Sequence, residues 1–480
     1  MRSKKEKRKK INMEITILCK VVDNYGDIGF VYRLARNITE LYPDTELRLV
    51  VSDLPSFAAM APFVKEGLAR QSARGWQIFD WNKEDVCTEE FSRRIPDVIL
   101  QCFQCQRPEW LDRILFDPEQ KKIVRIVNLE YLTAESWADD FHLLKSGTRS
   151  ILVKKVNFMP GFTKKTGGLV MDSSFLSSLQ NKEAALKTIQ DDLMAKAGTS
   201  SGTSSGTGAG ISANGQKEAE ADSVQALRDR NTFCVTIFAY KRNFTHVVGA
   251  LKSFMEERQK ENPLFRIHAF VAAGLACSPF EEAWKEEGCP FAITKLPYLS
   301  QEAWDALLCS SDFNFVRGED SFARACLCGK PFVWHAYPQD EELHLVKAGA
   351  VLERMESFFE DKEIFGFLKE YFLLYNTRYD AQFSDEEQGK ECQTTEKEPQ
   401  GKERESCEKK AGEKEPVEKE PVEKEPGERE PSEKEEELLL KLLRSYPALS
   451  KACTDFSKSL IENGNLTRHL MEFLGRQEWH

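Results

Sequence analysis

The stretch FNFVRGEDSFARACLCGKPFVWHAYPQD, residues 313–340, decides the fold class. Its apolar start, 313–316, predicts a strand that runs into Gly318 and two acids, and a helical pattern begins at Ser321. A further apolar run, 332–335, predicts the next strand, so the stretch predicts a β-α-β unit. At such a turn, backbone N–H groups and the positive end of the helix dipole favour a bound diphosphate.

The two acids of this turn, Glu319 and Asp320, suit a site that holds more than phosphate. Sugar and ribose hydroxyls need hydrogen-bond acceptors beside the donors that hold a diphosphate. The alternative is a charged turn that only caps a core helix, because strand-to-helix turns favour Gly, Asp and Ser in any case. The residues of this turn alone leave both interpretations open.

A second strand-to-helix turn lies near the N-terminus. The apolar run 15–22 leads into DNYGDIG, residues 23–29. The helix that follows has an apolar face made of Val31, Leu34, Ala35 and Ile38. The glycines do not form the dinucleotide-binding G-x-G-x-x-G pattern, and Asp27 would repel a pyrophosphate. Asp27 is better placed to accept a hydrogen bond from a nucleophile or a cationic acceptor; the alternative is an Asx-turn that only shapes the loop.

Five blocks of sequence occur in a fixed order between about residues 15 and 350. They are CKVVDNYGDIG at 19–29 with RLAR at 33–36, NLEYLTAE at 128–135, FMPGF at 158–162 with TGGL at 166–169, LPYLSQ at 296–301, and the opening stretch extended to residue 345. With these blocks the sequence resembles the EarP family, the bacterial protein-arginine rhamnosyltransferases that modify elongation factor P (EF-P).

The resemblance implies a GT-B glycosyltransferase that moves rhamnose from dTDP-β-L-rhamnose to an arginine nitrogen with inversion of the anomeric centre. It implies EF-P as the acceptor protein and no cofactor or metal. Asp27 corresponds to the family's general base and Asp23 to its acidic neighbour, with Tyr25 in the same acceptor site. Guanidinium is a poor nucleophile, because its pKa exceeds about 12 and its lone pairs are delocalised. A pair of carboxylates such as Asp23 and Asp27 can hold its planar fork and take a proton from it.

By the same resemblance, the second half of the chain binds the donor. The residues that correspond to those holding sugar and diphosphate are Glu319, Asp320 and Ser321, with Arg317 and Gly318 beside them. Tyr298 and Gln301 correspond to the thymidine pocket, and Phe238 and Tyr240 to aromatics around the base. The alternative for Phe238 and Tyr298 is that both are ordinary core aromatics at strand ends. Glu319 either helps charge develop at the sugar or binds a rhamnose hydroxyl, and both roles stay open.

The sequence departs from the family pattern at three places. Gln101 stands where the family has Glu, which puts the strength of acceptor binding in doubt. Leu129 stands where Trp is common, and the segment between residues 171 and 232 is longer than expected.

The length of 480 residues and the order of apolar runs predict two α/β halves, that is, two Rossmann-like domains of a GT-B fold facing a cleft, with disordered insertions. The expected strands lie near 14–22, 46–52, 97–103 and 123–132 in the first half, and 232–240, 265–274, 291–298, 313–316 and 332–335 in the second. The expected domains are a basic disordered arm (1–12), an N-terminal acceptor-binding domain (13–180), a flexible insertion and linker (181–230), a C-terminal nucleotide-sugar-binding domain (231–380), a disordered Glu/Lys/Pro-rich insertion (384–437) and C-terminal helices (438–480). The Gly/Ser/Thr/Ala run 198–215 and the proline at every fifth position near 417–427 underlie the two insertions. The last helix is expected to cross back onto the N-terminal domain, burying Phe456, Leu460, Leu470 and Phe473.

The composition limits the partners. A net charge of -11 argues against general nucleic-acid binding and suits a basic acceptor protein. No run approaches the roughly 20 apolar residues of a membrane span, and thirteen cysteines without a secreted framework predict reduced thiols in the cytoplasm. Two alternatives remain at this point: a GT-B enzyme with a lipid or small-molecule acceptor, and a non-catalytic protein that holds a nucleotide sugar or a translation factor.

Overall fold

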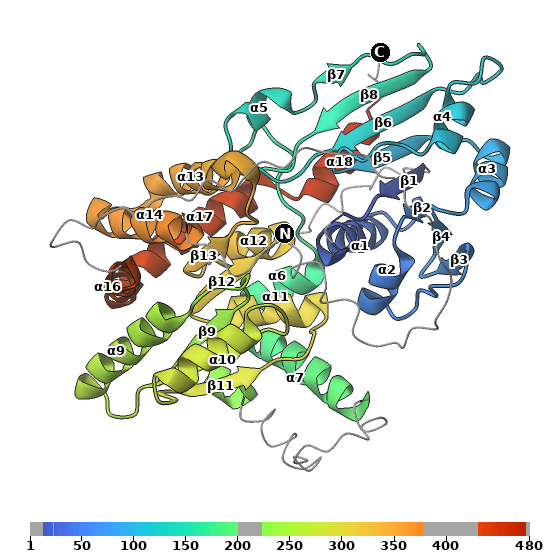
Figure 1. Ribbon diagram of the computed structural model, residues 1–480. Helices are drawn as coiled ribbons and strands as arrows, with labels where there is room; N and C mark the ends of the chain where they lie inside the picture. Colours follow the sequence, from blue (N-terminus) through green and yellow to red (C-terminus); the bar gives the residue numbers. More distant parts are fainter. Residues whose placement is uncertain (1–12, 23, 200–222, 378–430, 477–480) are drawn as a thin grey trace, which may run out of the picture.

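The computed structural model describes residues 13–22, 24–199, 223–377 and 431–476. The described residues form two lobes, each built on a mostly parallel sheet with helices packed on both faces (Figure 1). The N-lobe contains an eight-stranded sheet and the C-lobe a five-stranded one. The prediction of two Rossmann-like α/β domains is therefore confirmed.

The N-lobe sheet has the strand order β3-β4-β2-β1-β5-β6-β8-β7. Its strands are β1 (Glu14–Cys19), β2 (Glu46–Val51), β3 (Arg70–Ala73), β4 (Trp76–Asp80), β5 (Val98–Cys102), β6 (Val124–Leu129), β7 (Lys145–Ser146) and β8 (Val153–Phe158). The short strands β3 and β7 are antiparallel to their neighbours, and the other six strands are parallel. The order of strands reverses between β1 and β5, and the carboxyl edge at such a switch point is where α/β folds bind ligands.

Helices cover both faces of this sheet: α1 (Asn24–Leu41), α2 (Leu54–Met60), α3 (Glu84–Arg93), α4 (Glu109–Leu115) and α5 (Trp137–Phe141). The four residues expected on the apolar face of α1, Val31, Leu34, Ala35 and Ile38, are fully buried in one cluster with side chains of β1. Side chains of α3 and α4 form a second cluster on the opposite face. Helix α1 is thereby fixed with its first turn at the carboxyl edge of the sheet.

The C-lobe sheet has the order β11-β10-β9-β12-β13 and is parallel throughout. Its strands are β9 (Thr232–Ile237), β10 (Arg266–Val271), β11 (Ala292–Lys295), β12 (Phe313–Arg317) and β13 (Phe332–His335). Its helices include α9 (Thr245–Glu261), α10 (Cys277–Glu286), α11 (Gln301–Ser310), α12 (Glu319–Cys328), α13 (Leu343–Met355) and α14 (Lys362–Thr377), and the short 3-10 helices η2 (Asp340–Glu342) and η3 (Glu356–Phe358). The strand order here reverses between β9 and β12, so β12, the first element of the stretch 313–340, lies at the switch point.

The chain reaches the C-lobe earlier than the sequence indicated. Helix α6 (Ser173–Gln180) buries Phe175 in the C-lobe core. Helix α7 (Lys182–Thr199) packs on α11 through Ala185, Leu186, Ile189 and Leu193. The expectation of a flexible segment throughout 181–230 is therefore wrong for 182–199, because four apolar side chains at helical spacing among charged ones find a partner in α11. It is also wrong for 223–230, where residues 223–228 are helical and bury Val224 and Leu227 in the same cluster. Residues 200–222, like the expected arm at 1–12, lie outside the described residues.

The expected Glu/Lys/Pro-rich insertion ends earlier than residue 437. Helix α16 begins at Pro431 and ends at Arg444, and proline is tolerated at the first position of a helix because its missing N–H has no partner there. Glu435 is buried and its carboxylate pairs with Arg242 of the C-lobe at 2.8 Å. The prediction of disorder is thus wrong for 431–437, and the remainder, 384–430, lies outside the described residues.

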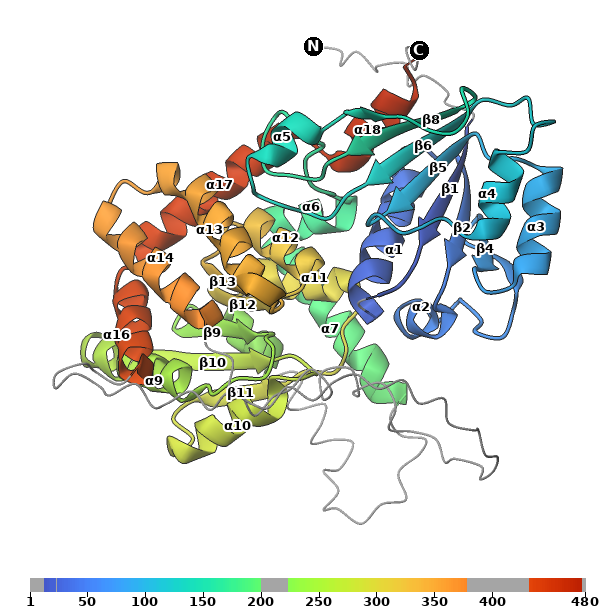
Figure 2. The same ribbon diagram turned by 45° about the horizontal axis from the view of Figure 1, so that its top comes forward.

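The last two helices connect the lobes. Helix α17 (Tyr446–Asn463) buries Phe456 and Leu460 in the C-lobe core. Helix α18 (Leu466–Leu474) buries Leu470 in the N-lobe core, where Phe473 packs at the edge. Figure 2 shows α17 beside α13 and α14, and α18 beside the N-lobe sheet. The chain therefore returns to the lobe in which it began. The expectation that one helix buries all four residues on the N-terminal domain is wrong for Phe456 and Leu460, because the chain breaks at Gly464 between two helices that pack on different lobes.

The junction between α17 and α18 makes a prediction about stability. Gly168 has a φ of +79°, and a Cβ there would lie 2.5 Å from the carbonyl oxygen of Gly464. Gly288 has nearly the same φ, +81°, with nothing within 4 Å of a Cβ. Gly168→Ala is expected to lower the free energy of unfolding by about 1–3 kcal/mol more than Gly288→Ala, since only the former adds a clash to the backbone strain. Urea denaturation of both variants checks this, and equal losses would contradict it.

Candidate active site

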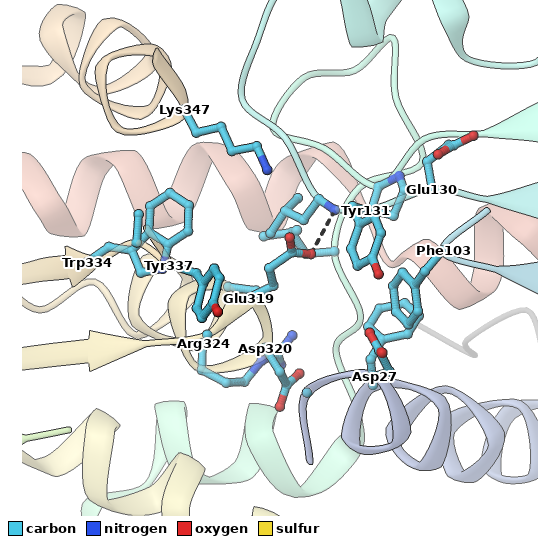
Figure 3. Close-up of a pocket in the computed structure, with 18 of the residues that line it drawn as sticks. Asp27, Phe103, Glu130, Tyr131, Glu319, Asp320, Arg324, Trp334, Tyr337 and Lys347 are labelled. Carbon is cyan, nitrogen blue, oxygen red and sulfur yellow. Dashed lines mark hydrogen bonds between the residues drawn. The ribbon is translucent and has the colours of Figure 1, made fainter. Parts of the chain in front are cut away.

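A cavity of about 440 Å³ lies between the lobes, at the carboxyl ends of strands next to both switch points. Its N-lobe side includes Asp27, Phe103, Glu130 and Tyr131, and its C-lobe side includes Tyr240, Gly318, Glu319, Asp320, Arg324, Tyr337 and Lys347. Figure 3 shows acids and aromatic rings of the two lobes facing one another across it. Sequence segments almost 300 residues apart thus meet at one site.

Asp27 lies in the first turn of α1 and lines the cavity from the N-lobe. Its side chain is 3% exposed, and its Oδ2 accepts the backbone N–H of Val22 at 2.8 Å. A carboxylate at a helix N-terminus is stabilised by the dipole. Asp23 lies outside the described residues. Tyr25 belongs to the same helical turn, and its side chain also lies outside the described part of the chain.

Helix α12 begins at Glu319, two residues before the predicted start at Ser321. Gly318 is the N-cap with a φ of +73°, which allows β12 to turn directly into the helix. Glu319 therefore occupies the first turn rather than the loop. Its Oε2 accepts the backbone N–H of Leu132 from the N-lobe at 3.2 Å, the dashed line of Figure 3. This carboxylate thus reaches across the cavity.

Asp320, also in the first turn of α12, is held by a residue of the N-lobe. Arg33 donates from Nε to Oδ1 at 3.0 Å and from Nη2 to Oδ2 at 2.9 Å. Burial on its own would raise the pKa of Asp320, but the positive charges of Arg33 and Arg324 hold that pKa below its usual value. Asp320 is therefore an ionised carboxylate at the edge of the cavity.

Arg324 is a site residue whose role was not predicted. It lies one turn after Asp320 on α12, is 1% exposed and lines the cavity. Its Nη2 donates to the carbonyl of Val170, whereas its Nε and Nη1 have no hydrogen-bond partner within the described parts of the chain. A buried guanidinium with unused donors favours an anion. Because the helix was expected to begin at Ser321, the i, i+4 spacing of Asp320 and Arg324 was not recognised.

Two aromatic rings form a wall next to Asp27. Phe103 follows β5 and stacks on Tyr131, with 4.6 Å between ring centroids and 22° between planes. Phe103 and the next residue, Gln104, both have positive φ, 57° and 51°. Strained backbone of this kind persists where the surrounding structure fixes it, often at functional sites. The sequence did not indicate this pair.

Behind this wall lies Glu130, 7% exposed, whose carboxylate points away from Asp27 (Figure 3). It accepts hydrogen bonds from Gln104, at 2.7 Å, and from Asn128. Burial raises the pKa of Glu130, although the hydrogen bond from Gln104 lowers it. A second, polar cavity of about 730 Å³ begins here and contains Gln101, the residue that departs from the family pattern. Gln101 therefore does not line the cavity that holds Asp27.

The remaining predicted donor residues divide into two groups. Tyr240 lines the cavity. Arg317 lies beside it, with its guanidinium over the rings of Phe238 at 4.9 Å and Tyr240 at 4.8 Å. Ser321 Oγ accepts the indole N–H of Trp304 at 3.0 Å. Phe238, Arg317 and Ser321 thus form an adjacent cluster that does not line the cavity itself.

Tyr298 and Gln301 do not line the cavity. Tyr298 is 65% exposed in the loop before α11. Gln301 begins α11 and donates from Nε2 to the carbonyl of Gly29 in α1 at 2.9 Å, so it joins the lobes. A thymidine pocket at these residues stays a prediction.

Two properties of the described residues bear on the kind of site. No group of three or more His, Cys, Asp or Glu side chains among them is arranged to hold a metal ion. No helix within the same ranges is long and apolar enough to cross a membrane.

Two doubly wound lobes with a cavity between their carboxyl edges define a GT-B fold. Residues 15–419 match the family described as Elongation-Factor P (EF-P) rhamnosyltransferase EarP. The chain belongs to this family, and the resemblance noted in the sequence is confirmed.

Relatives named protein-arginine rhamnosyltransferase are 31% identical to the chain over the matched region. The protein-arginine rhamnosyltransferase of Pseudomonas putida is 31% identical over 345 residues, covering 70% of this chain and 80% of that protein. The one from Shewanella oneidensis is 31% identical over 355 residues, covering 70% and 79%. A solved structure described as the basis for EarP-mediated arginine glycosylation of translation elongation factor EF-P is 18% identical, with a TM-score of 0.48 and coverage of 96% of this chain and 98% of that one.

Proposed function

We propose that this protein transfers rhamnose from dTDP-β-L-rhamnose to an arginine of EF-P with inversion, and so supports translation of polyproline stretches in the cytoplasm. The observation that carries the proposal is the set of groups facing one cavity: Asp27 from the N-lobe, and Glu319 with Arg324 from the C-lobe. Family membership supports the sugar and the acceptor, since the relatives are named for arginine rhamnosylation.

The acceptor arginine enters on the N-lobe side. Its planar guanidinium stacks on the aromatic wall of Phe103 and Tyr131, which has the flat apolar surface that guanidinium prefers. Asp27 accepts one N–H and removes that proton as the nitrogen attacks the anomeric carbon. Because Asp27 is buried, its hydrogen bond to the guanidinium is not weakened by competing water.

The donor occupies the C-lobe side. The free Nε and Nη1 of Arg324, with the backbone at the start of α12, hold the diphosphate and stabilise the charge that develops on it. Glu319 accepts a rhamnose hydroxyl or faces the positive charge of the sugar in the transition state. The C1–N bond forms on the N-lobe face while the C1–O bond to the diphosphate breaks on the C-lobe face, which inverts the anomeric centre. The proton passes to Asp27.

The test is to measure release of nucleoside diphosphate with EF-P present and a panel of donors: dTDP-rhamnose, dTDP-glucose and UDP-glucose. Release of dTDP from dTDP-rhamnose alone, dependent on EF-P, is expected. An NMR spectrum of the product then reports its anomeric configuration. Equal release from all three donors would contradict the assigned donor. Release without EF-P would contradict the assigned acceptor.

A further inference from the structure

Arg33 of α1 is fully buried, and every N–H of its guanidinium is used. One fork binds Asp305, with Nη1 at 2.6 Å and Nη2 at 3.0 Å from its oxygens. The other fork binds Asp320 through Nε and Nη2. Nη1 also donates to Asp172 at 3.2 Å. A guanidinium has five N–H donors in a fixed plane, so this one is saturated.

The three carboxylates belong to the C-lobe side of the molecule, whereas Arg33 belongs to the N-lobe. Asp305 lies on α11 and Asp320 in the first turn of α12. Asp172 caps α6, accepting the N–H of Phe175 at 2.8 Å, where the chain passes from one lobe to the other. One side chain therefore joins three elements across the interface.

The arrangement is specific to lobes that are together. If the lobes separated, water would hydrate Arg33 and the three carboxylates. In the closed arrangement, with the lobes in contact, these groups are buried and pair with one another instead. Two more contacts lie alongside: Arg36 pairs with Glu302 at 2.5 Å, and Gln301 donates to Gly29. Residues 29–36 of α1 are thus matched to the first half of α11 and the first turn of α12.

Asp320 connects this cluster to the cavity. It lines the cavity and follows Glu319, so the fork of Arg33 fixes the first turn of α12 from the opposite lobe. A shift of that turn would displace Glu319 and, one turn later, Arg324.

We propose that Arg33 is a positioning residue: it holds the two lobes together and, through Asp320, sets the start of α12 in the geometry that binds the donor. The role of Arg33 in donor binding rests on the proposed function, whereas its role in holding the lobes together does not. The inference predicts that the site is complete only in the closed arrangement.

The experiment compares Arg33→Met and Arg33→Lys with the wild type, using the full chain. Small-angle X-ray scattering measures the radius of gyration without ligand, and calorimetry measures dTDP binding. Both variants are expected to have a larger radius of gyration and to bind dTDP about tenfold more weakly or worse, because charge-assisted hydrogen bonds across the interface are lost. Lysine keeps the charge but cannot form two forks, so it tests geometry in a variant that is expected to fold.

Arg48→Met is the matched control. Arg48 is equally buried and pairs with buried Glu14 at 2.7 Å, but both lie within the N-lobe. Its loss is expected to lower the melting temperature while leaving the radius of gyration and the dTDP affinity unchanged. A purely structural role for Arg33 would make the variants resemble this control.

A folded Arg33→Lys variant with the radius of gyration and dTDP affinity of the wild type would overturn the inference. If the wild type does not bind dTDP, the proposed donor is wrong. The radius of gyration then decides on its own whether Arg33 holds the lobes together. Neither measurement needs EF-P, so failure of the acceptor assignment does not affect the result.

Discussion

Asp27→Asn is expected to bind dTDP as the wild type does and to lose about 10²–10⁴-fold in turnover with EF-P, the range that general-base catalysis contributes. The amide keeps the size of the carboxylate and can still accept the N–H of Val22, so α1 stays in place. It cannot take a proton from guanidinium. The C-lobe, which supplies the donors for the diphosphate, is unchanged by the substitution.

Asp53→Asn is its control. Asp53 also lies in the N-lobe at the start of a helix, where it caps α2 by accepting the N–H of Ser56, and it does not line the cavity. Asparagine caps helices as well as aspartate does, so turnover should be close to that of the wild type. Steady-state kinetics with saturating donor and calorimetry with dTDP separate the two effects. Normal turnover in Asp27→Asn would remove Asp27 from the role of base.

Arg324→Gln is expected to show the opposite pattern, with dTDP affinity about 10–100-fold lower because two hydrogen bonds from a charged group to the diphosphate are lost or weakened. The free Nε and Nη1 of Arg324 carry this expectation. Turnover should fall as well, and more steeply at low donor concentration.

Arg354→Gln is the matched control for this variant. Arg354 lies on α13 of the C-lobe and donates from Nε to the carbonyl of Ala134, so it also reaches the N-lobe, but it does not line the cavity. Its loss should leave dTDP affinity unchanged. If calorimetry shows the same dTDP affinity for Arg324→Gln and the wild type, the diphosphate does not lie against Arg324.

The two sheets could be predicted because their central strands are apolar on both faces. The apolar runs that form β1, β5, β9 and β12 are bounded by turn residues. The helical spacing of apolar residues after Asp27 predicted which face of α1 packs on the sheet. Strand β8 was missed because it contains two lysines and an asparagine, with side chains that are only partly buried. Strand β3 was missed for the same reason, since it has no apolar run. Strands β4 and β7 were also missed: β4 has a glutamine between its apolar residues, and β7 is two residues long.

Helix α7 and the start of α16 could not be predicted because their partners are distant in sequence; the rest of α16 belongs to the C-terminal helices that the sequence predicted. The charged residues of α7 hide a narrow apolar face that is recognisable only beside α11. In α16, Glu435 looks like one more acid of a charged repeat until Arg242 lies next to it. In both cases tertiary packing overrides a local composition that favours disorder.

The acids of the site followed from the two turns, because the carboxyl ends of parallel strands meet at one edge. The roles of Phe103, Tyr131 and Arg324 depend on contacts between strands or lobes and had no comparable signal. Arg33 is the clearest case. It was part of a quoted motif, yet its partners Asp305 and Asp320 lie more than 270 residues away.

The most direct measurement is intact-mass spectrometry of EF-P after incubation with dTDP-rhamnose and either the wild type or Asp27→Asn, with fragmentation to locate any added mass. The account predicts one deoxyhexose on one arginine with the wild type and almost none with Asp27→Asn over the same time. Unmodified EF-P with the wild-type enzyme, or a sugar on a residue other than arginine, would contradict it.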